Sequence, residues 1–371
     1  MSESAVRVIA VGGSHREMGA QHGRQVADLR PAILGRIVAG EERLQQDGAG
    51  PAFEQLIAQT AGVLAAHSPA TIDLLRGLSA GLDIPYEQLL RYNLAAFLRD
   101  VLTTRRRLDE EAAAAVEGCT TWAATGPATA DGLPVLAKNR DYDREHLPLQ
   151  TVVRATPERG YRYTFVTSAG SPGVFVAGFN ETGLSVVDTH VPSTDIGPGL
   201  PIYALSMHIL EEHNTVRSAL DFLRATPRLG RNNLLLADAT GDVACFEAGY
   251  TAYGLREAEQ GLLVNTNHFN SPAMAGAYVD TEIPALRGNS QRRYRQVTAA
   301  LQAQAEQIDL TWGEALMRSH DGAPASICRH PFGDAPTSTI ASLFFVPAAR
   351  TMILYHGLPC DPATPRAEFH Y

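Results

Sequence analysis

The stretch AAAAVEGCTTWAATG, residues 112–126, divides the chain into two parts with different sequence patterns. Before it, apolar residues recur mostly at helical spacing. From Cys119 onward, short β-rich runs alternate with turn residues. Gly118 stands directly before the cysteine that begins the first of these runs, CTTWAAT. The boundary therefore singles out Cys119 as a candidate functional residue.

Composition limits the classes of partner. The chain has 371 residues, of which 45% are hydrophobic and 19% charged, with a net charge of −9. Such a chain can bury a large core, and its scattered acidic residues argue against nucleic acid or a membrane surface as a partner. The start MSESAVRV lacks the features of a signal peptide, so we expect a cytoplasmic protein. The sequence predicts no metal site, because Cys119, Cys245, Cys328 and Cys360 form no CxxC pair and no HExxH spacing occurs.

The order of predicted elements indicates an α+β protein. Helical patterns cover residues 15–37, where Pro31 should kink the helix, and then 53–66, 68–82 and 85–102. Residues 102–118 are expected to be a surface connector. The β-rich runs are at residues 119–125, 133–139, 151–156, 161–168, 173–179, 184–190, 233–248, 261–269 and 337–357. Further helices are predicted at 203–213, 216–226 and within 290–318. Two sheets with helices outside them would satisfy this order, as would other α+β layouts.

The Gly118–Cys119 pair suggests a specific chemistry. If the bond between the two residues is cut, Cys119 gains a free α-amino group with an ordinary pKa of about 7.7–8.0. This amine can act as the base for the residue's own thiol, so no histidine is required. Gly118 offers no side chain that would hinder attack on its carbonyl. A buried structural cysteine is the alternative interpretation of the pair alone.

The surrounding motifs resemble the acyl-coenzyme A:6-aminopenicillanate (isopenicillin N) acyltransferase family of N-terminal-nucleophile hydrolases. The resemblance rests on motifs in the same order and at similar spacing, namely EGCTTWAA, GLPVLAKNRDYD, GFNETGLSVV, LLVNTNHFNS, SICRHP and, near the N-terminus, HREMGAQHG. It implies a four-layer αββα sandwich of two antiparallel sheets. Residues 1–118 would form a mostly helical α chain and residues 119–371 a β chain after self-cleavage, together one structural domain.

The resemblance also implies roles for individual residues. Cys119 would be the nucleophile, Asp141 the residue that orients it, and Asn267 the oxyanion-hole donor. Arg329 resembles a family arginine near the nucleophile. The competing assignments are Asp143 for the aspartate, Asn265 for the asparagine and Arg293 for the arginine. An asparagine of the bile-salt branch would fall at His190, so that role is open.

The sequence thus predicts a self-activated amidohydrolase or acyltransferase that works on small N-acyl amides through a Cys119 thioester. No cofactor is expected, although a coenzyme A thioester could be a substrate, and the two fragments should stay associated. One alternative is an uncleaved hydrolase that pairs Cys119 with His268 or His190. Another is a degenerate family member that binds a small ligand without turnover.

Overall fold

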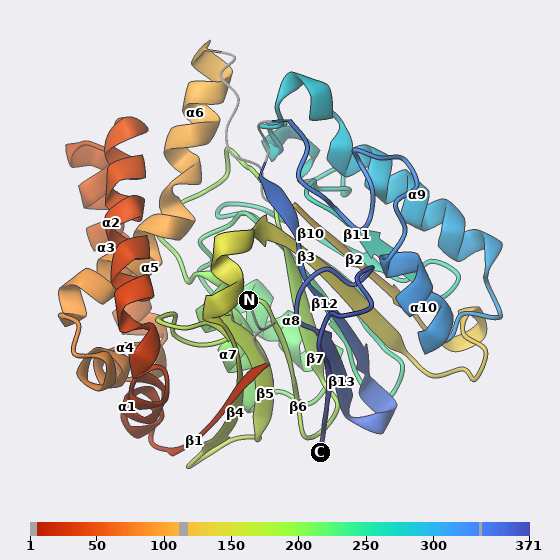
Figure 1. The fold of residues 1–371 in the computed structure, drawn as a ribbon, viewed down its shortest axis with the longest axis horizontal. Coiled ribbons are helices and arrows are strands. Elements are labelled where there is room, and N and C mark those ends of the chain that lie inside the picture. The colour runs from red at the N-terminus through yellow and green to blue at the C-terminus, as the bar shows by residue number, and fades with distance from the viewer. Residues whose placement is uncertain (1–5, 111–117, 334–335) are drawn as a thin grey trace.

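The computed structural model describes residues 6–110, 118–333 and 336–371. Two β-sheets lie face to face in the middle of the molecule, with helices outside both (Figure 1). The first sheet has the strand order β1-β4-β5-β6-β7-β8-β9-β10, and the second has the order β11-β2-β3-β12-β13-β14. The predicted αββα sandwich is therefore confirmed.

The strands of the first sheet are β1 Arg7–Gly13, β4 Gln150–Pro157, β5 Tyr163–Ser168, β6 Ala177–Asn180, β7 Ser185–His190, β8 Asn232–Ala237, β9 Val243–Ala248 and β10 Tyr253–Glu257. Those of the second are β11 Leu262–Asn265, β2 Gly118–Ala124, β3 Val135–Asp143, β12 Thr337–Val346, β13 Thr351–Tyr355 and β14 Arg366–His370. The expectation of two purely antiparallel sheets is wrong at one edge, because β1 pairs with β4 in parallel. The sequence pattern did not predict β1, β10 and β14, which are all edge strands.

Helices form the two outer layers, as the left and right sides of Figure 1 show. The helices on the first sheet's side are α1 His15–Gln25, α2 Arg30–Gln46, α3 Pro51–His67, α4 Pro69–Leu82, α5 Tyr86–Leu98, α6 Asp100–Glu110, α7 Ile202–Glu212 and α8 Val216–Ala225. The second sheet is covered by α9 Asn289–Ala303 and α10 Leu310–Met317. Helix α6 occupies part of the expected surface connector, so that prediction is wrong over 102–110; residues 111–117 lie outside the described residues.

Pro31 separates two helices rather than kinking one. It lies in the first turn of α2, where backbone N–H groups have no acceptor within the helix. The N–H that proline lacks therefore costs no hydrogen bond there. A short 3₁₀ turn, Ala27–Leu29, joins this helix to α1. The helix boundary therefore falls just before the proline, as its chemistry favours.

Three apolar clusters explain the layering. One joins the N-terminal helices, α7 and α8 to the outer face of the first sheet. The second fills the space between the sheets, and the third packs α9 and α10 on the outer face of the second sheet. Alternation along β2 and β3 sends Ala123 and Leu136 between the sheets, and Trp122 and Ala137 toward α9 and α10.

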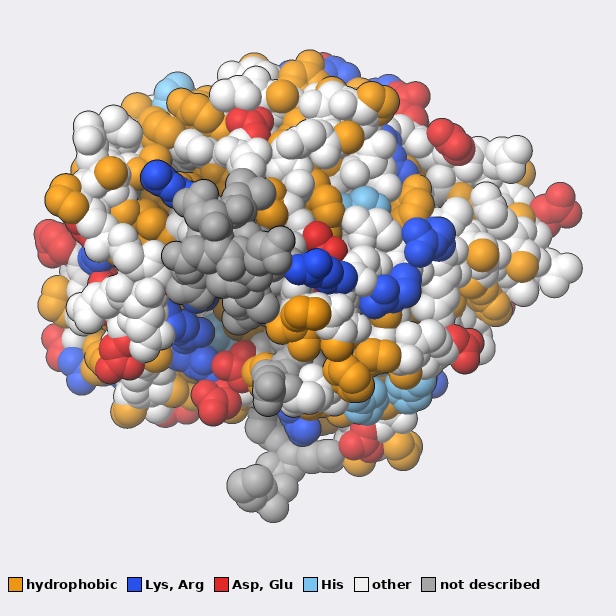
Figure 2. All heavy atoms as spheres, turned by 90° about the horizontal axis from the view of Figure 1, so that it is seen from above, with side chains coloured by type: hydrophobic (Ala, Val, Ile, Leu, Met, Phe, Trp, Pro, Cys, Tyr) orange, Lys and Arg blue, Asp and Glu red, His pale blue; other side chains and the backbone are white. Residues whose placement is uncertain are grey.

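No helix of the described part of the chain is long and apolar enough to cross a membrane. One face of the molecule carries Lys, Arg, Asp and Glu side chains interspersed with hydrophobic ones (Figure 2). Neither sign of charge dominates the visible part of this face.

Candidate active site

Cys119 is the second residue of β2, which lies between β11 and β3 inside the second sheet. Antiparallel pairing places Gly118 opposite Asp141 and Cys119 opposite Arg140. The cysteine is only 8% exposed. At Cys119 the strand β3 lies on one side, while the pairing of β11 with β2 ends at Thr121, so another group must hold the second side of the Cys119 backbone.

Asn267 and Arg293 hold the backbone of Cys119. The Asn267 side-chain oxygen accepts the backbone N–H of Cys119 at 2.9 Å. The Arg293 guanidinium donates to the Cys119 carbonyl oxygen at 2.6 Å, to the Thr120 hydroxyl at 2.8 Å and to the Asn267 Oδ1 at 2.8 Å. The Asn267 amide nitrogen donates to the carbonyl of His190 at 2.8 Å. The peptide nitrogen that would become the α-amine is thus fixed by hydrogen bonds.

Asp141 lies on the other side of the same peptide. Its Oδ1 accepts the Thr339 hydroxyl at 2.7 Å, and that hydroxyl accepts the Arg329 backbone N–H at 2.8 Å. Burial raises the pKa of Asp141, and the charges of Arg293 and Arg329 act in the opposite direction. A Cβ on Gly118 would lie 2.8 Å from both Asp141 Oδ2 and Arg329 Nη1. A side chain at position 118 would therefore displace the Asp141 carboxylate and the Arg329 guanidinium.

The Cys119 side chain faces a cavity of about 80 Å³ between the sheets and the N-terminal helices. Its walls combine apolar side chains from Phe97, Phe175 and Ile202 with the charged residues Lys138, Arg140, Asp188, His190 and Arg231. Burial, aided by the negative charges of Asp188 and Asp141, raises the pKa of the Cys119 thiol to about 11, and Lys138 opposes this. In the uncut chain the thiol is therefore protonated at neutral pH.

The structure separates the competing assignments. Asn265 is the last residue of β11, and its side-chain oxygen accepts a hydrogen bond from Arg256 at 2.8 Å. Asp143 caps a 3₁₀ turn through the Glu145 N–H and pairs with Arg36 at 3.0 Å. Both side chains bond groups outside the Cys119 network, whereas Asn267 and Asp141 lie within it.

Of the two candidate arginines, Arg293 makes the direct contacts. Both arginines are buried, and Arg329 approaches Glu282 at 3.9 Å. Arg293 lies on α9 and is fully buried, so it is not a solvated surface charge. Arg293 shares a buried helix face with Val297 and Leu301, four and eight residues later, and this spacing is the signal in the sequence that could have revealed it.

The two histidines of the alternative mechanism have other partners. The His268 ring bonds the Ser290 hydroxyl at 2.8 Å, and burial together with Arg293 lowers the pKa of His268 to about 4. His190 lines the cavity, and its Nε2 contacts Asp100 of α6. The low pKa of His268 makes it a poor base for Cys119, whereas contact with a carboxylate is the kind that orients a catalytic base, so the Cys/His alternative rests on His190.

A sequence model of the acyl-coenzyme A:6-aminopenicillanic acid acyl-transferase family matches residues 128–360, which is more than half of the chain. The chain belongs to this family. The predicted class, an amide-bond hydrolase or acyltransferase of the N-terminal-nucleophile type, is thereby confirmed. The match contains Asp141, Asn267, Arg293 and Arg329, and begins nine positions after Cys119.

Two solved structures are similar to this family member. A mutant form of conjugated bile acid hydrolase from Clostridium perfringens is 13% identical with a TM-score of 0.44, over 68% of this chain and 97% of that one. Penicillin V acylase from Agrobacterium tumefaciens is 17% identical with a TM-score of 0.43, over 64% and 83% of the two chains. A search of curated protein sequences gave no match.

The sequence analysis missed Lys138 and Asp188, a buried pair in the cavity. Lys138 Nζ donates to Asp188 Oδ1 at 2.6 Å and to the backbone carbonyls of Asp188 and Val176. Strand alternation offered a signal, because Leu136, Lys138 and Arg140 share one face of β3. A lysine on the inner face of a buried strand is rarely found without a partner.

Proposed function

We propose that this family member cuts its own Gly118–Cys119 bond and then hydrolyses or transfers small N-acyl amides through a thioester on Cys119. The observation that carries the proposal is the set of side chains around one peptide. Asn267 and Arg293 bind the backbone of Cys119, and Asp141 lies against Gly118.

Self-cleavage begins when the Cys119 sulfur attacks the carbonyl carbon of Gly118. The C–N bond then breaks, the nitrogen of Cys119 takes up a proton and becomes the α-amine, and Gly118 is held as a thioester. Water attacks the thioester carbonyl, which releases the Gly118 carboxylate and the free thiol. No other reactant is needed.

Turnover repeats this chemistry on a substrate. The new α-amine, with an ordinary pKa near 8, accepts the thiol proton, and the sulfur attacks the substrate carbonyl. The amide nitrogen leaves with that proton, and water or an acceptor amine resolves the acyl-enzyme. Asn267 is the proposed donor to the oxyanion, and Asp141 the proposed partner of the α-amine.

The cavity indicates what the substrate could be. Phe97, Phe175 and Ile202 suit an apolar acyl group, while Lys138 and Asp188 supply charge beside the sulfur. We therefore expect an amide with a small apolar acyl part and a polar amine part. A coenzyme A thioester would serve as an alternative acyl donor, and the two fragments would remain together because β1 and β4 pair across them.

Intact-mass spectrometry tests the proposal. Wild-type protein should give fragments that begin at Met1 or Ser2 and at Cys119, whereas Cys119→Ala should stay whole. Cys245→Ala, a buried cysteine on β9, is the matched control and should be cut normally. Incubation with small amides should add the acyl mass to the fragment that begins at Cys119. An uncut, active wild type would instead support a Cys/His hydrolase, and an uncut, inert one a binding protein.

A further inference from the structure

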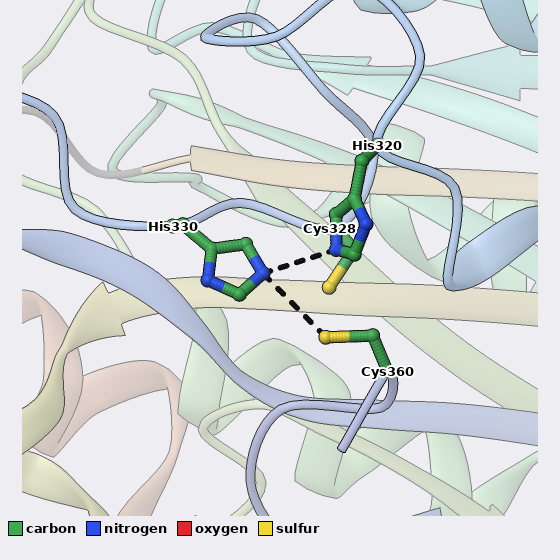
Figure 3. Close-up of side chains that lie close together, drawn as sticks. All are labelled: His320, Cys328, His330 and Cys360. Carbon is green, nitrogen blue, oxygen red and sulfur yellow. Dashed lines mark hydrogen bonds between the residues drawn. The ribbon is translucent and has the colours of Figure 1, made fainter.

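Four metal-ligating side chains meet at the surface, outside the Cys119 network. His320, Cys328 and His330 lie on the loop after α10, and Cys360 lies on the loop between β13 and β14. Figure 3 shows the four side chains pointing toward one another from these two segments. Each offers one ligand atom, and all four atoms lie within 4.8 Å of one another.

The distances fit a tetrahedral ion. Bonds of about 2.3 Å from zinc to sulfur and about 2.0–2.1 Å to nitrogen give edges of about 3.3–3.8 Å between neighbouring ligand atoms. The two histidine Nε2 atoms are 3.0 Å apart, and Cys360 Sγ is 3.5 Å from His330 Nε2. The histidines are exposed and can rotate to close a wider separation, while Cys328 is buried beneath them.

We propose that His320, Cys328, His330 and Cys360 bind one zinc ion in a closed, structural site. Two thiolates and two imidazoles are a donor set that favours zinc among the common ions. Four protein ligands leave no open position for a reacting water, so the ion stabilises the fold rather than taking part in catalysis. This departs from the expectation of no metal, which rested on spacing along the sequence.

The site connects to the Cys119 network through the backbone. Arg329 stands between two of the ligands, and its N–H and carbonyl are both bound by Thr339, the residue whose hydroxyl reaches Asp141. A zinc ion would therefore tie the loop that carries Arg329 to the segment around Cys360. The proposal does not depend on self-cleavage, because its ligands take no part in that reaction.

The test measures metal content of the full-length protein. Protein expressed with added Zn²⁺ and dialysed against metal-free buffer should retain one zinc per chain by elemental mass spectrometry. Cys360→Ala and His320→Ala should each weaken zinc binding at least 100-fold in competition with a chromogenic chelator. Both residues lie at the surface, so these variants are expected to fold. Cys245→Ala should bind as wild type does.

Cobalt provides a second readout. Co²⁺ in the wild-type site should show the visible absorption of a tetrahedral ion with thiolate charge-transfer bands, and Cys360→Ala should lose part of the latter. Wild-type protein without stoichiometric zinc would overturn the proposal. So would zinc binding that both variants retain, or a Cys328–Cys360 disulfide in the purified, metal-free protein.

Discussion

The rate of self-cleavage should rise steeply with pH. The Cys119 thiol of the uncut chain has its pKa raised to about 11 by burial. At pH 7 the thiolate is then about one part in 10⁴, and at pH 9 about one part in 10². If the thiolate is the species that attacks Gly118, the cleavage rate should increase about 100-fold between these two values.

Turnover by the cut enzyme should respond differently. Its base is the α-amine, whose ordinary pKa is about 7.7–8.0, so the reactive fraction rises only about sevenfold between pH 7 and 9 and then levels off. The contrast between the two pH profiles distinguishes a thiol that ionises alone from one that is assisted by its own amine.

The assay follows newly made protein. A brief cell-free synthesis is stopped, the labelled chain is moved to buffers between pH 7 and 9, and the fragments are quantified on denaturing gels. Cys119→Ala at each pH corrects for other proteolysis. The pH range ends at 9 so that the protein stays folded. The pKa of the Cys119 thiol in the folded chain lies above its ordinary value of 9, so its contribution to the free energy of unfolding is fully present below pH 9 and is lost as the pH rises toward 11. A cleavage rate that changes less than about threefold would refute the reasoning and indicate a neighbouring base.

Three substitutions probe the rest of the site. Asn267→Ala should lower kcat by about 10²–10³ with little change in KM, measured on pre-cut enzyme, because it removes a donor to the oxyanion; an unchanged kcat would place the oxyanion donor elsewhere. Asp141→Asn should slow both self-cleavage and turnover at least tenfold, whereas Asp143→Asn should do neither, and the reverse pattern would exchange their roles. Arg293→Met should lower the free energy of unfolding by about 3–5 kcal/mol in urea titrations, because it removes one of the two positive charges that compensate buried Asp141. The control is Arg292→Met at an exposed position, which should change the free energy of unfolding by less than about 0.5 kcal/mol.

The helices and most strands could be predicted because their signals are local. The β-rich runs 173–179 and 184–190 predicted β6 and β7, and Gly183 between them has a φ of +94°, which a tight turn requires. The edge strands β1, β10 and β14 escaped prediction for the opposite reason. Each bonds only one neighbouring strand, so its sequence is less constrained to look like a strand.

The site was predictable in part, and the limit is again physical. Family-like motifs marked Cys119, Asp141 and Asn267, because each lies within a short distinctive sequence. Three of the proposed zinc ligands, His320, Cys328 and His330, lie within eleven residues of one another, but the fourth, Cys360, lies 30 positions after His330 and meets them only through the loop between β13 and β14. Residues that meet through tertiary structure alone leave no spacing to recognise.

The charge balance around Asp141 bears on the proposed self-cleavage. Asp141 and Glu282 face Arg293 and Arg329 in a buried cluster, so two acids meet two bases. Among the described residues, Asp141 Oδ2 has no hydrogen-bond partner, although it lies beside Gly118. A buried carboxylate oxygen without a donor is costly unless the reaction supplies one. The proposed cleavage would free the Cys119 nitrogen, now held by Asn267, to rotate as an amine, and an N–H turned toward Oδ2 would give this oxygen a donor. The same carboxylate that is poorly satisfied in the precursor would then orient the base of the mature enzyme.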